Sequence, residues 1–264
     1  MTVRDALGAA LDALTAAGCE TPRLDAEVLI ADALGVDRGA LVADPDMAVP
    51  GSAARLIGER IRRRVSREPV AYILGRKGFR RIELLVDRRV LIPRPETELL
   101  VEVALELPVG ASVHDVGTGS GAVALALLDE RPDLVVTASD ASSSAVDVAR
   151  ANAARLALPL DVCVARGVPE GTRAMLLANL PYVREDEWSS LQPEIVRYEP
   201  REALVGGADG LDPIRELVAA SPSGTHVALE HAPGQAEAVR GLLRESETRP
   251  DLAGRERVTL GLVR

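Results

Sequence analysis

The sequence has few aromatic residues, few cysteines and almost no lysine. Aromatic side chains make up 2% of the 264 residues, and this scarcity argues against a protein that stacks single-stranded nucleic acid on its rings. Cys19 and Cys163, the two cysteines, are too few for a disulfide scaffold and have no metal-binding spacing. We therefore predict a reduced protein without a metal site. Lys77 is the one lysine among 31 basic residues.

Long apolar runs are also missing. None approaches the roughly 20 residues that a membrane-spanning helix needs, and the amphipathic N-terminus carries Asp5 and Asp12 where a leader peptide has an apolar core. We expect a cytoplasmic protein with no membrane partner. The content of 47% apolar and 27% charged residues is enough for a hydrophobic core and excludes a wholly disordered chain.

Charge is unevenly distributed along the chain. The net charge is −9, but residues 55–94 contain 13 basic and 4 acidic side chains. One interpretation is a solvated helix face followed by a hairpin. The other is a docking surface for an acidic protein or a nucleic acid. The sequence leaves both open.

The pattern of apolar residues changes twice along the chain. Residues 1–67 have apolar positions at helical spacing, and residues 72–92 form short β-rich runs that suit a hairpin. After Pro93, strands alternate with helices, including a helix expected over 234–246, and such alternation is typical of a parallel, doubly wound sheet. We predict an α/β protein with a helical domain at 1–70, a β-hairpin linker at 71–93 and a Rossmann-like domain at 94–264.

A glycine-rich turn follows the first strand of the predicted sheet. Asp115 ends that strand, Gly117, Gly119 and Gly121 follow it, and Asp140 ends the next strand. Glycines allow a ligand to approach the backbone at the carboxyl edge of the sheet, and a carboxylate there can accept hydrogen bonds from ribose hydroxyls. The group resembles the S-adenosylmethionine site of class I methyltransferases. A tight turn without a ligand is the alternative, but its glycines would lower stability for no gain.

A second polar turn, Asn179-Leu180-Pro181-Tyr182, follows an apolar strand. Methylation of a planar NH₂ group requires two acceptors that orient its hydrogens and stabilise developing positive charge. The side-chain oxygen of Asn179 can be one acceptor and the carbonyl of Leu180 the other, since Pro181 restricts Leu180 to an extended conformation. Tyr182 could then lie against the flat face of the substrate.

Several segments occur in the order and spacing typical of one family. They are 68–79, 91–102, 115–127, 178–183, 198–214, 229–239 and 255–261. On these segments, and above all on Arg94-Pro95-Glu96-Thr97-Glu98, the chain resembles the release factor N5-glutamine methyltransferases. That family methylates the glutamine of the Gly-Gly-Gln motif in bacterial peptide chain release factors, with S-adenosylmethionine as methyl donor. The resemblance implies a class I methyltransferase fold and a protein partner in place of a nucleic acid.

The resemblance also implies roles for individual residues. The catalytic and substrate-binding residues would be Asn179, Leu180, Pro181 and Tyr182. The donor would be bound by Asp115, Gly117, Thr118, Gly119, Ser120, Gly121, Asp140 and Asn179, with Pro95 and Thr97 near it and Phe79 closing over it.

The sequence departs from the family pattern at two places. Leu180 stands where the family has a first proline, as in RNA adenine dimethyltransferases. The acidic and bulky residues that flank adenine are replaced by Arg166-Gly167-Val168, and a later Phe-Asp pair by Arg173-Ala174. An RNA adenine methyltransferase and a non-enzymatic relative with impaired donor binding are therefore alternative hypotheses.

Residues 205–212, which contain Gly206-Gly207, are predicted to form a mobile loop that in the family context could border the substrate cleft. Glu230-His231 ends a predicted strand at the ligand edge of the sheet, where a packing role is favoured over a supporting role behind the site.

Overall fold

The computed structural model describes residues 1–169 and 175–264. The chain divides into two compact units. The first consists of Met1–Gly75 and Gln192–Tyr198, and the second of Arg76–Leu191 and Glu199–Arg264. Each unit has a hydrophobic core of its own, and we describe them one at a time.

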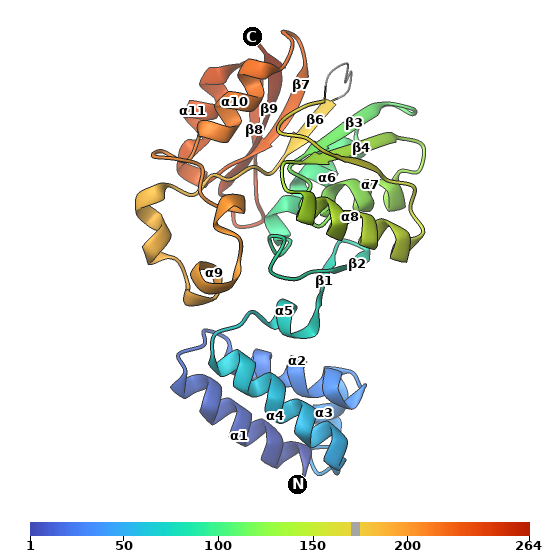
Figure 1. The fold of residues 1–264 in the computed structure, drawn as a ribbon, viewed down its shortest axis with the longest axis vertical. Helices are drawn as coiled ribbons and strands as arrows, with labels where there is room; N and C mark the ends of the chain where they lie inside the picture. The colour runs from blue at the N-terminus through green and yellow to red at the C-terminus, as the bar shows by residue number, and fades with distance from the viewer. Residues whose placement is uncertain (170–174) are drawn as a thin grey trace. The chain divides into compact units, whose positions relative to one another are not determined.

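The first unit is entirely helical in its described elements (Figure 1). It contains α1 (Val3–Ala16), α2 (Pro22–Leu34), α3 (Arg38–Ala43), α4 (Gly51–Val65), α5 (Val70–Leu74) and α9 (Pro193–Tyr198). The helices predicted within residues 1–67 are thereby confirmed.

Local sequence signals explain where the first helices begin and end. Thr2 and Asp5 form a reciprocal capping box at the start of α1. Helix α2 begins at Pro22, where the proline needs no amide hydrogen, and ends at Gly35 with a left-handed φ of 66°. The buried face of α1 is Val3, Ala6, Ala10 and Leu14, at the spacing of an amphipathic helix.

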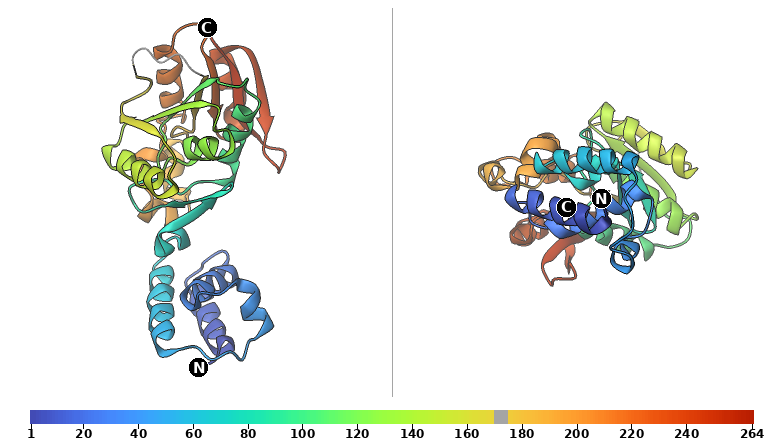
Figure 2. Two further views of the ribbon diagram at one scale, coloured as in Figure 1. Left: turned by 90° about the vertical axis from the view of Figure 1, so that its right-hand side faces the viewer. Right: turned by 90° about the horizontal axis from the view of Figure 1, so that it is seen from below.

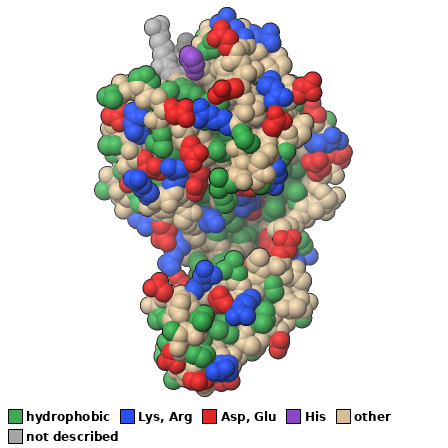
Figure 3. Space-filling view, turned by 180° about the vertical axis from the view of Figure 1, so that it is seen from behind, with side chains coloured by type: hydrophobic (Ala, Val, Ile, Leu, Met, Phe, Trp, Pro, Cys, Tyr) green, Lys and Arg blue, Asp and Glu red, His purple; other side chains and the backbone are tan. Residues whose placement is uncertain are grey.

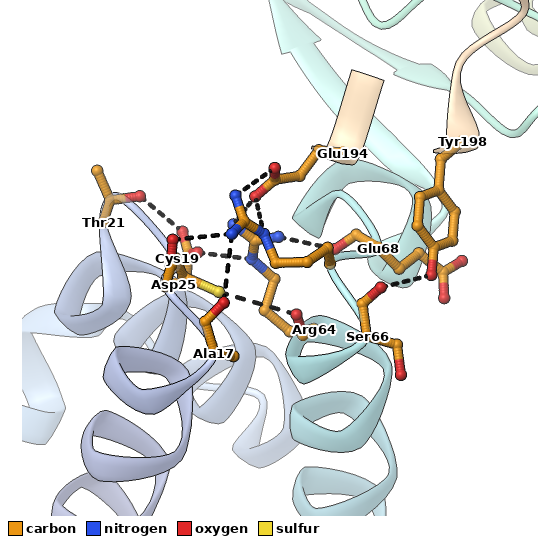
Figure 4. Close-up of polar contacts among 11 residues, drawn as sticks. Ala17, Cys19, Thr21, Asp25, Arg64, Ser66, Glu68, Glu194 and Tyr198 are labelled. Atoms are coloured by element: carbon orange, nitrogen blue, oxygen red, sulfur yellow. Dashed lines mark hydrogen bonds and ion pairs between the residues drawn. The ribbon is translucent and has the colours of Figure 1, made fainter. Parts of the chain in front are cut away.

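A buried cluster of charges connects α2, α4 and α9 within the first unit (Figure 4). Arg64 Nε donates to Asp25 Oδ2 at 2.7 Å, and Arg64 Nη2 donates to Glu194 Oε1 at 2.7 Å. Arg67 makes two further hydrogen bonds to the Glu194 carboxylate, at 2.9 and 2.6 Å. The planar guanidinium matches a carboxylate at two points. The segment 192–198 is therefore held to the helical unit, although it is distant in sequence.

The second unit is built on a sheet of seven strands in the order β5-β4-β3-β6-β7-β9-β8. The strands are β3 (Ser112–Val116), β4 (Val135–Asp140), β5 (Asp161–Val164), β6 (Met175–Ala178), β7 (His226–Glu230), β8 (Leu243–Pro250) and β9 (Glu256–Val263). Strands β3 to β7 pair in parallel, and β9 pairs antiparallel with β7 and β8. Figures 1 and 2 show β8 and β9 at one edge of the sheet. The predicted α/β fold with a largely parallel sheet is confirmed.

Helices accompany both halves of the sheet (Figure 1). They are α6 (Glu98–Leu105), α7 (Ala122–Glu130), α8 (Ser143–Leu156), α10 (Asp212–Ala220) and α11 (Ala236–Leu242). Val116 belongs to the same core cluster as Ile214 of α10. Because side chains alternate along a strand, its neighbour Asp115 points to the other face of the sheet. The carboxyl ends of β3, β4 and β6, where the chain order reverses, meet at one edge, which is where open α/β sheets bind ligands.

The structure corrects three sequence expectations. The segment 72–74 belongs to α5 instead of a strand, and the hairpin is confined to β1 (Arg76–Phe79) and β2 (Ile82–Leu85), with no strand over 88–92. The helix expected over 234–246 ends at Leu242, because the chain continues there as β8 paired with β9. Pairing with a neighbouring strand outweighed the local helical pattern. In the described part of the chain, no helix has the length and apolar character to cross a bilayer.

We expect Arg64→Ala to lower the free energy of unfolding by about 3–5 kcal/mol, because removal of one partner leaves buried charges uncompensated. Urea unfolding followed by circular dichroism measures the change. The control is Arg4→Ala, which removes the exposed ion pair with Asp46 and should cost less than about 1 kcal/mol. Equal losses for the two variants would show that the buried cluster does not stabilise the helical unit.

Candidate functional site

A cavity of about 740 Å³ lies at the carboxyl edge of the sheet in the second unit, a size typical of small-molecule sites. The glycine-rich turn, the end of β4, the Asn-Leu-Pro-Tyr turn and the segment before α6 all contribute to its wall. The residues named by the sequence analysis that line it are Thr97, Asp115, Gly117, Thr118, Gly119, Ser120, Asp140, Asn179, Leu180 and Pro181.

The glycine-rich turn is held to the neighbouring strand by backbone hydrogen bonds. The amides of Gly117 and Thr118 both donate to the carbonyl of Ser139, at 2.8 and 3.0 Å. Gly117, Gly119 and Gly121 have φ values of 73°, 56° and 84°, in the left-handed region that favours glycine. The turn therefore requires glycines for its backbone path, and this path brings its main chain to the cavity.

Asp140, at the end of β4, joins the glycine-rich turn to the start of α8. Its Oδ2 accepts a hydrogen bond from the Gly119 amide at 2.9 Å, and its Oδ1 accepts one from the Ser142 amide at 2.8 Å. A carboxylate has further acceptor positions beyond these two. Asp140 can thus fix the glycine turn and still accept hydrogen bonds from a ligand in the cavity.

Asp115 supports the glycine-rich turn through a side-chain hydrogen bond. It is buried, and its Oδ2 accepts a hydrogen bond from the Thr118 hydroxyl at 2.6 Å. Burial raises the pKa of Asp115 to about 6, and the Asp140 carboxylate adds to that rise, while the hydrogen bond from Thr118 opposes it. A buried carboxyl with a raised pKa therefore lies in the wall of the cavity.

Asn179 is oriented by Thr97. The Asn179 amide nitrogen Nδ2 donates to Thr97 Oγ1 at 2.9 Å, and both residues line the cavity. Because the nitrogen is used inside the protein, the side-chain oxygen Oδ1 remains as the acceptor. This is the role that the sequence analysis predicted for Asn179, and Thr97 is what fixes it.

Leu180 packs against the glycine-rich turn. A side-chain methyl carbon of Leu180 lies 3.0 Å from the position that a Cβ on Gly117 would take. The same side chain also packs against the core cluster beneath the sheet. Leucine at this position therefore joins the two turns by apolar contact, while its backbone carbonyl is retained.

The segment 205–212 packs against the Asn-Leu-Pro-Tyr turn, a contact that the sequence analysis did not predict in detail. A Cβ on Gly206 would lie 2.3 Å from the carbonyl oxygen of Pro181, and one on Gly210 would lie 2.1 Å from that of Tyr182. Gln235 Nε2 donates to the carbonyl of Tyr182 at 3.0 Å. The segment predicted to be a mobile loop thus packs against the turn, and its glycines are there because side chains would not fit.

Behind the turn lies a buried acid, Glu230, at the end of β7. Its Oε1 accepts a hydrogen bond from the Tyr182 hydroxyl at 3.2 Å, and its side chain is fully buried. Burial raises the pKa of Glu230 to about 7, against the opposing effects of Thr97 and Arg257. Burial also raises the pKa of Tyr182, and the nearby Glu230 charge adds to this rise. Tyr182 is therefore protonated near neutral pH, whereas Glu230 changes its protonation state in that range.

Four of the predicted site residues are not among the described residues that line the cavity. They are Phe79, Pro95, Gly121 and Tyr182. Phe79 is buried in the hairpin opposite Ile82, so the structure does not place it over the cavity. Pro95 begins the short 3₁₀ helix Pro95–Thr97 and so positions Thr97. Gly121 turns the chain into α7, and Tyr182 points to Glu230.

The side of the cavity expected to hold adenine is formed by residues 165–167. Arg166 Nη2 lies 2.8 Å from Glu216 Oε2, and both residues line the cavity. Ser139 Oγ donates to the carbonyl of Gly167 at 3.0 Å, and its hydroxyl is within 2.9 Å of His114 Nε2. Polar groups thus border this side although the family's acid is replaced. The second departure, at 173–174, lies outside the described residues.

Many basic side chains of the window at 55–94 form ion pairs with acidic side chains inside or outside the window. Its paired side chains include Arg60, Arg63, Arg64, Arg67, Arg76, Arg80, Arg89 and Arg94. The face drawn in Figure 3 accordingly shows acidic and basic side chains intermixed. On that face the positive charge does not form an unbroken basic surface, and the ion pairs weaken the nucleic-acid interpretation.

Comparison with known proteins agrees with this site. Residues 5–75 match the PrmC N-terminal domain, and residues 95–207 match the methyltransferase small domain. The release factor glutamine methyltransferase of Caulobacter vibrioides is 38% identical over 99% of this chain and 96% of its own length. The one from Pseudomonas aeruginosa is 44% identical, covering 90% and 92%.

A solved structure shows the same fold. The hMettl16 catalytic domain, determined in complex with the MAT2A 3′UTR hairpin 6, matches with a TM-score of 0.53 and 14% identity, over 76% of this chain and 81% of that one. Such identity speaks for the fold alone. The two curated relatives, in contrast, are similar to this chain along nearly its whole length. The chain belongs to the release factor glutamine methyltransferase family.

Proposed function

We propose that the protein transfers a methyl group from S-adenosylmethionine to the side-chain amide nitrogen of the glutamine in the Gly-Gly-Gln motif of a peptide chain release factor. The observation that carries this proposal is the hydrogen bond from Asn179 to Thr97. It leaves the Asn179 oxygen as an acceptor beside a cavity that is also lined by the glycine-rich turn and Asp140. An acceptor next to a nucleoside-sized site is what methylation of a planar NH₂ group requires.

The residues of the cavity fit the donor. The left-handed glycine turn presents main chain to the methionine portion, and Asp140 has acceptor positions left for ribose hydroxyls. S-Adenosylmethionine, when bound, supplies an electrophilic methyl group. These features also speak against the hypothesis of a relative that cannot bind the donor.

The protein's own groups would orient and stabilise the accepting nitrogen. The Asn179 oxygen and the Leu180 carbonyl would each accept one hydrogen of the glutamine NH₂ group. As the new N–C bond forms and the S–C bond breaks, positive charge develops on nitrogen between these two oxygens. The nitrogen then releases one proton to solvent. Because the transfer is direct, no covalent intermediate with the protein is needed.

The substrate that binds in the cavity would be a loop of a protein. Residues 1–70 would form the substrate-recognition domain and residues 71–93 the linker. Support comes from the match of residues 5–75 to a domain found in this family. Intermixed charge on the surface favours a folded protein over RNA as the partner.

Asn179→Ala should lower the rate of glutamine methylation by about 100-fold or more, because it removes one of the two acceptors that act on the transition state. The rate is measured with radiolabelled donor and a purified release factor. Ser190→Ala, at an exposed site, is the matched control. Label that is retained when the substrate glutamine is replaced by alanine would contradict the proposed function.

Asp140→Asn should weaken donor binding by about 10- to 100-fold. The asparagine side chain has one acceptor oxygen, whereas the backbone amides of Gly119 and Ser142 each donate to a separate oxygen of Asp140. Isothermal titration calorimetry with S-adenosylmethionine measures the affinity. Asp129→Asn, at an exposed position of α7, should leave the affinity unchanged. An unaltered affinity in the Asp140 variant would remove this residue from the donor site.

Leu180→Pro should change the methylation rate by no more than about threefold, or ~0.6 kcal/mol. The substitution keeps the backbone carbonyl that serves as the second acceptor and restores the proline typical of the family. Release-factor methylation under single-turnover conditions is the measurement. A loss of activity much larger than this would mean that the packing of Leu180 on Gly117 matters more than the carbonyl.

A further inference from the structure

A buried carboxylate behind the substrate turn has no role in the chemistry described so far. Glu230 ends β7 and is fully buried, yet its Oε2 makes no hydrogen bond to any described residue. Buried carboxylates are rarely left in this state, since each unpaired oxygen costs desolvation energy. A glutamate kept there despite this cost calls for a functional reason.

Glu230 is in contact with the turn that would hold the glutamine. Its Oε1 accepts the hydroxyl hydrogen of Tyr182, and the turn residue Asn179 is bonded to Thr97. Thr97 Oγ1 has accepted the Asn179 hydrogen bond and still carries a hydrogen of its own. The influence of the Thr97 hydroxyl on the Glu230 carboxyl shows that these two groups are close.

Charged groups surround Glu230 from each neighbouring element. Arg257 of β9 favours the carboxylate, whereas Glu96 of the 3₁₀ helix disfavours it. Arg257 is itself buried, and its Nε is the other buried side-chain atom without a hydrogen bond in the described chain. The neighbouring His231 faces away, with its ring nitrogens on Ala232 and Thr259. The carboxylate thus has one nearby cation and two hydroxyl donors.

We propose that Glu230, as a carboxylate, is a positioning residue that orients both Tyr182 and the Thr97–Asn179 pair for the glutamine substrate. Glu230 Oε1 accepts the Tyr182 hydroxyl, and the unpaired Oε2 would accept the Thr97 hydroxyl in the substrate complex. Thr97 Oγ1 would then present its lone pair to Asn179 Nδ2. This fixes the Asn179 oxygen toward the cavity. The inference rests on the proposed methylation of glutamine.

Protonation would undo this arrangement. A carboxylic acid carries a hydrogen on one oxygen, so that oxygen becomes a donor and no longer offers a carboxylate acceptor to the hydroxyl on its side. Because the pKa of Glu230 is raised to about 7 by burial, the wild-type rate of methyl transfer should fall as pH is lowered through about 7. Single-turnover rates at saturating release factor and donor isolate this step from docking.

Glu230→Gln tests the role of the carboxylate. The amide has one acceptor, so we expect kcat to fall about tenfold at pH near 8, with KM for the release factor and donor affinity unchanged. The decrease in rate on the acid side should disappear, since no carboxyl remains to titrate. A variant with wild-type kcat, or with the acid-side decrease intact, overturns the inference.

Tyr182→Phe is an independent test that does not depend on the folding of the Glu230 variant. The Tyr182 hydrogen bond lowers the pKa of Glu230, so its loss should move the midpoint of the acid-side decrease to higher pH. Tyr198→Phe is the matched control, because its hydroxyl donates to the Ser66 carbonyl in the helical unit, and it should leave the midpoint unchanged. An unmoved midpoint in Tyr182→Phe contradicts the proposed network.

The two levels of proposal fail in different ways. If the wild-type protein does not methylate the release factor, the proposed function is wrong. If it methylates the glutamine but the two variants keep the wild-type pH profile, the function stands and only the role of Glu230 is rejected.

Discussion

The site depends on one steric constraint, the close approach of two backbone segments. Gly206 and Gly210 lie so near the carbonyls of Pro181 and Tyr182 that no Cβ fits between them. The carbonyl of Tyr182 is further held by Gln235. These contacts restrict the path of the turn at Pro181 and Tyr182. Under the proposed function, this restriction would help to place Asn179 and the Leu180 carbonyl before the substrate binds, which is the preorganisation that methyl transfer to an amide requires.

The polar groups around this turn are organised in layers. Asn179 borders the cavity, Thr97 fixes its amide, and Glu230 lies behind both Thr97 and Tyr182. On the donor side, Asp140 and Asp115 hold the glycine turn in the same way. In both places a carboxylate accepts hydrogen bonds from backbone or hydroxyl donors. Asp115, Asp140 and Thr97 themselves line the cavity, whereas Glu230 lies behind its wall.

The helical unit is stabilised by a different kind of interaction. Arg64 and Arg67 fasten Glu194 of the segment 192–198 to α2 and α4. This segment lies between the substrate turn and Glu199 in the sequence, and Glu199 accepts hydrogen bonds from Arg94 and the Ile92 amide in the second unit. Glu194 in the first unit and Glu199 in the second are thus both buried acids paired with arginine.

The sequence by itself determined the alternation of strands and helices, the glycine turn, Asp140 and the Asn-Leu-Pro-Tyr turn, because each depends on local periodicity or on the conformation of a few residues. The tertiary structure decided what lies behind them. The sequence suggested that the loop with Gly206 could border the cleft and that Glu230 faces the ligand edge, but the contacts of Gly206, Gly210, Gln235 and Glu230 with the turn appear only in the folded chain. The ends of elements also depended on the fold, since Leu243 joins β8 only because β9 pairs with it. Likewise, part of the positive charge of the basic window is paired with acids that lie outside it in sequence, such as Glu130 and Glu194. Contacts between residues remote in sequence carry no signal in composition or spacing, and for that reason only the folded chain reveals them.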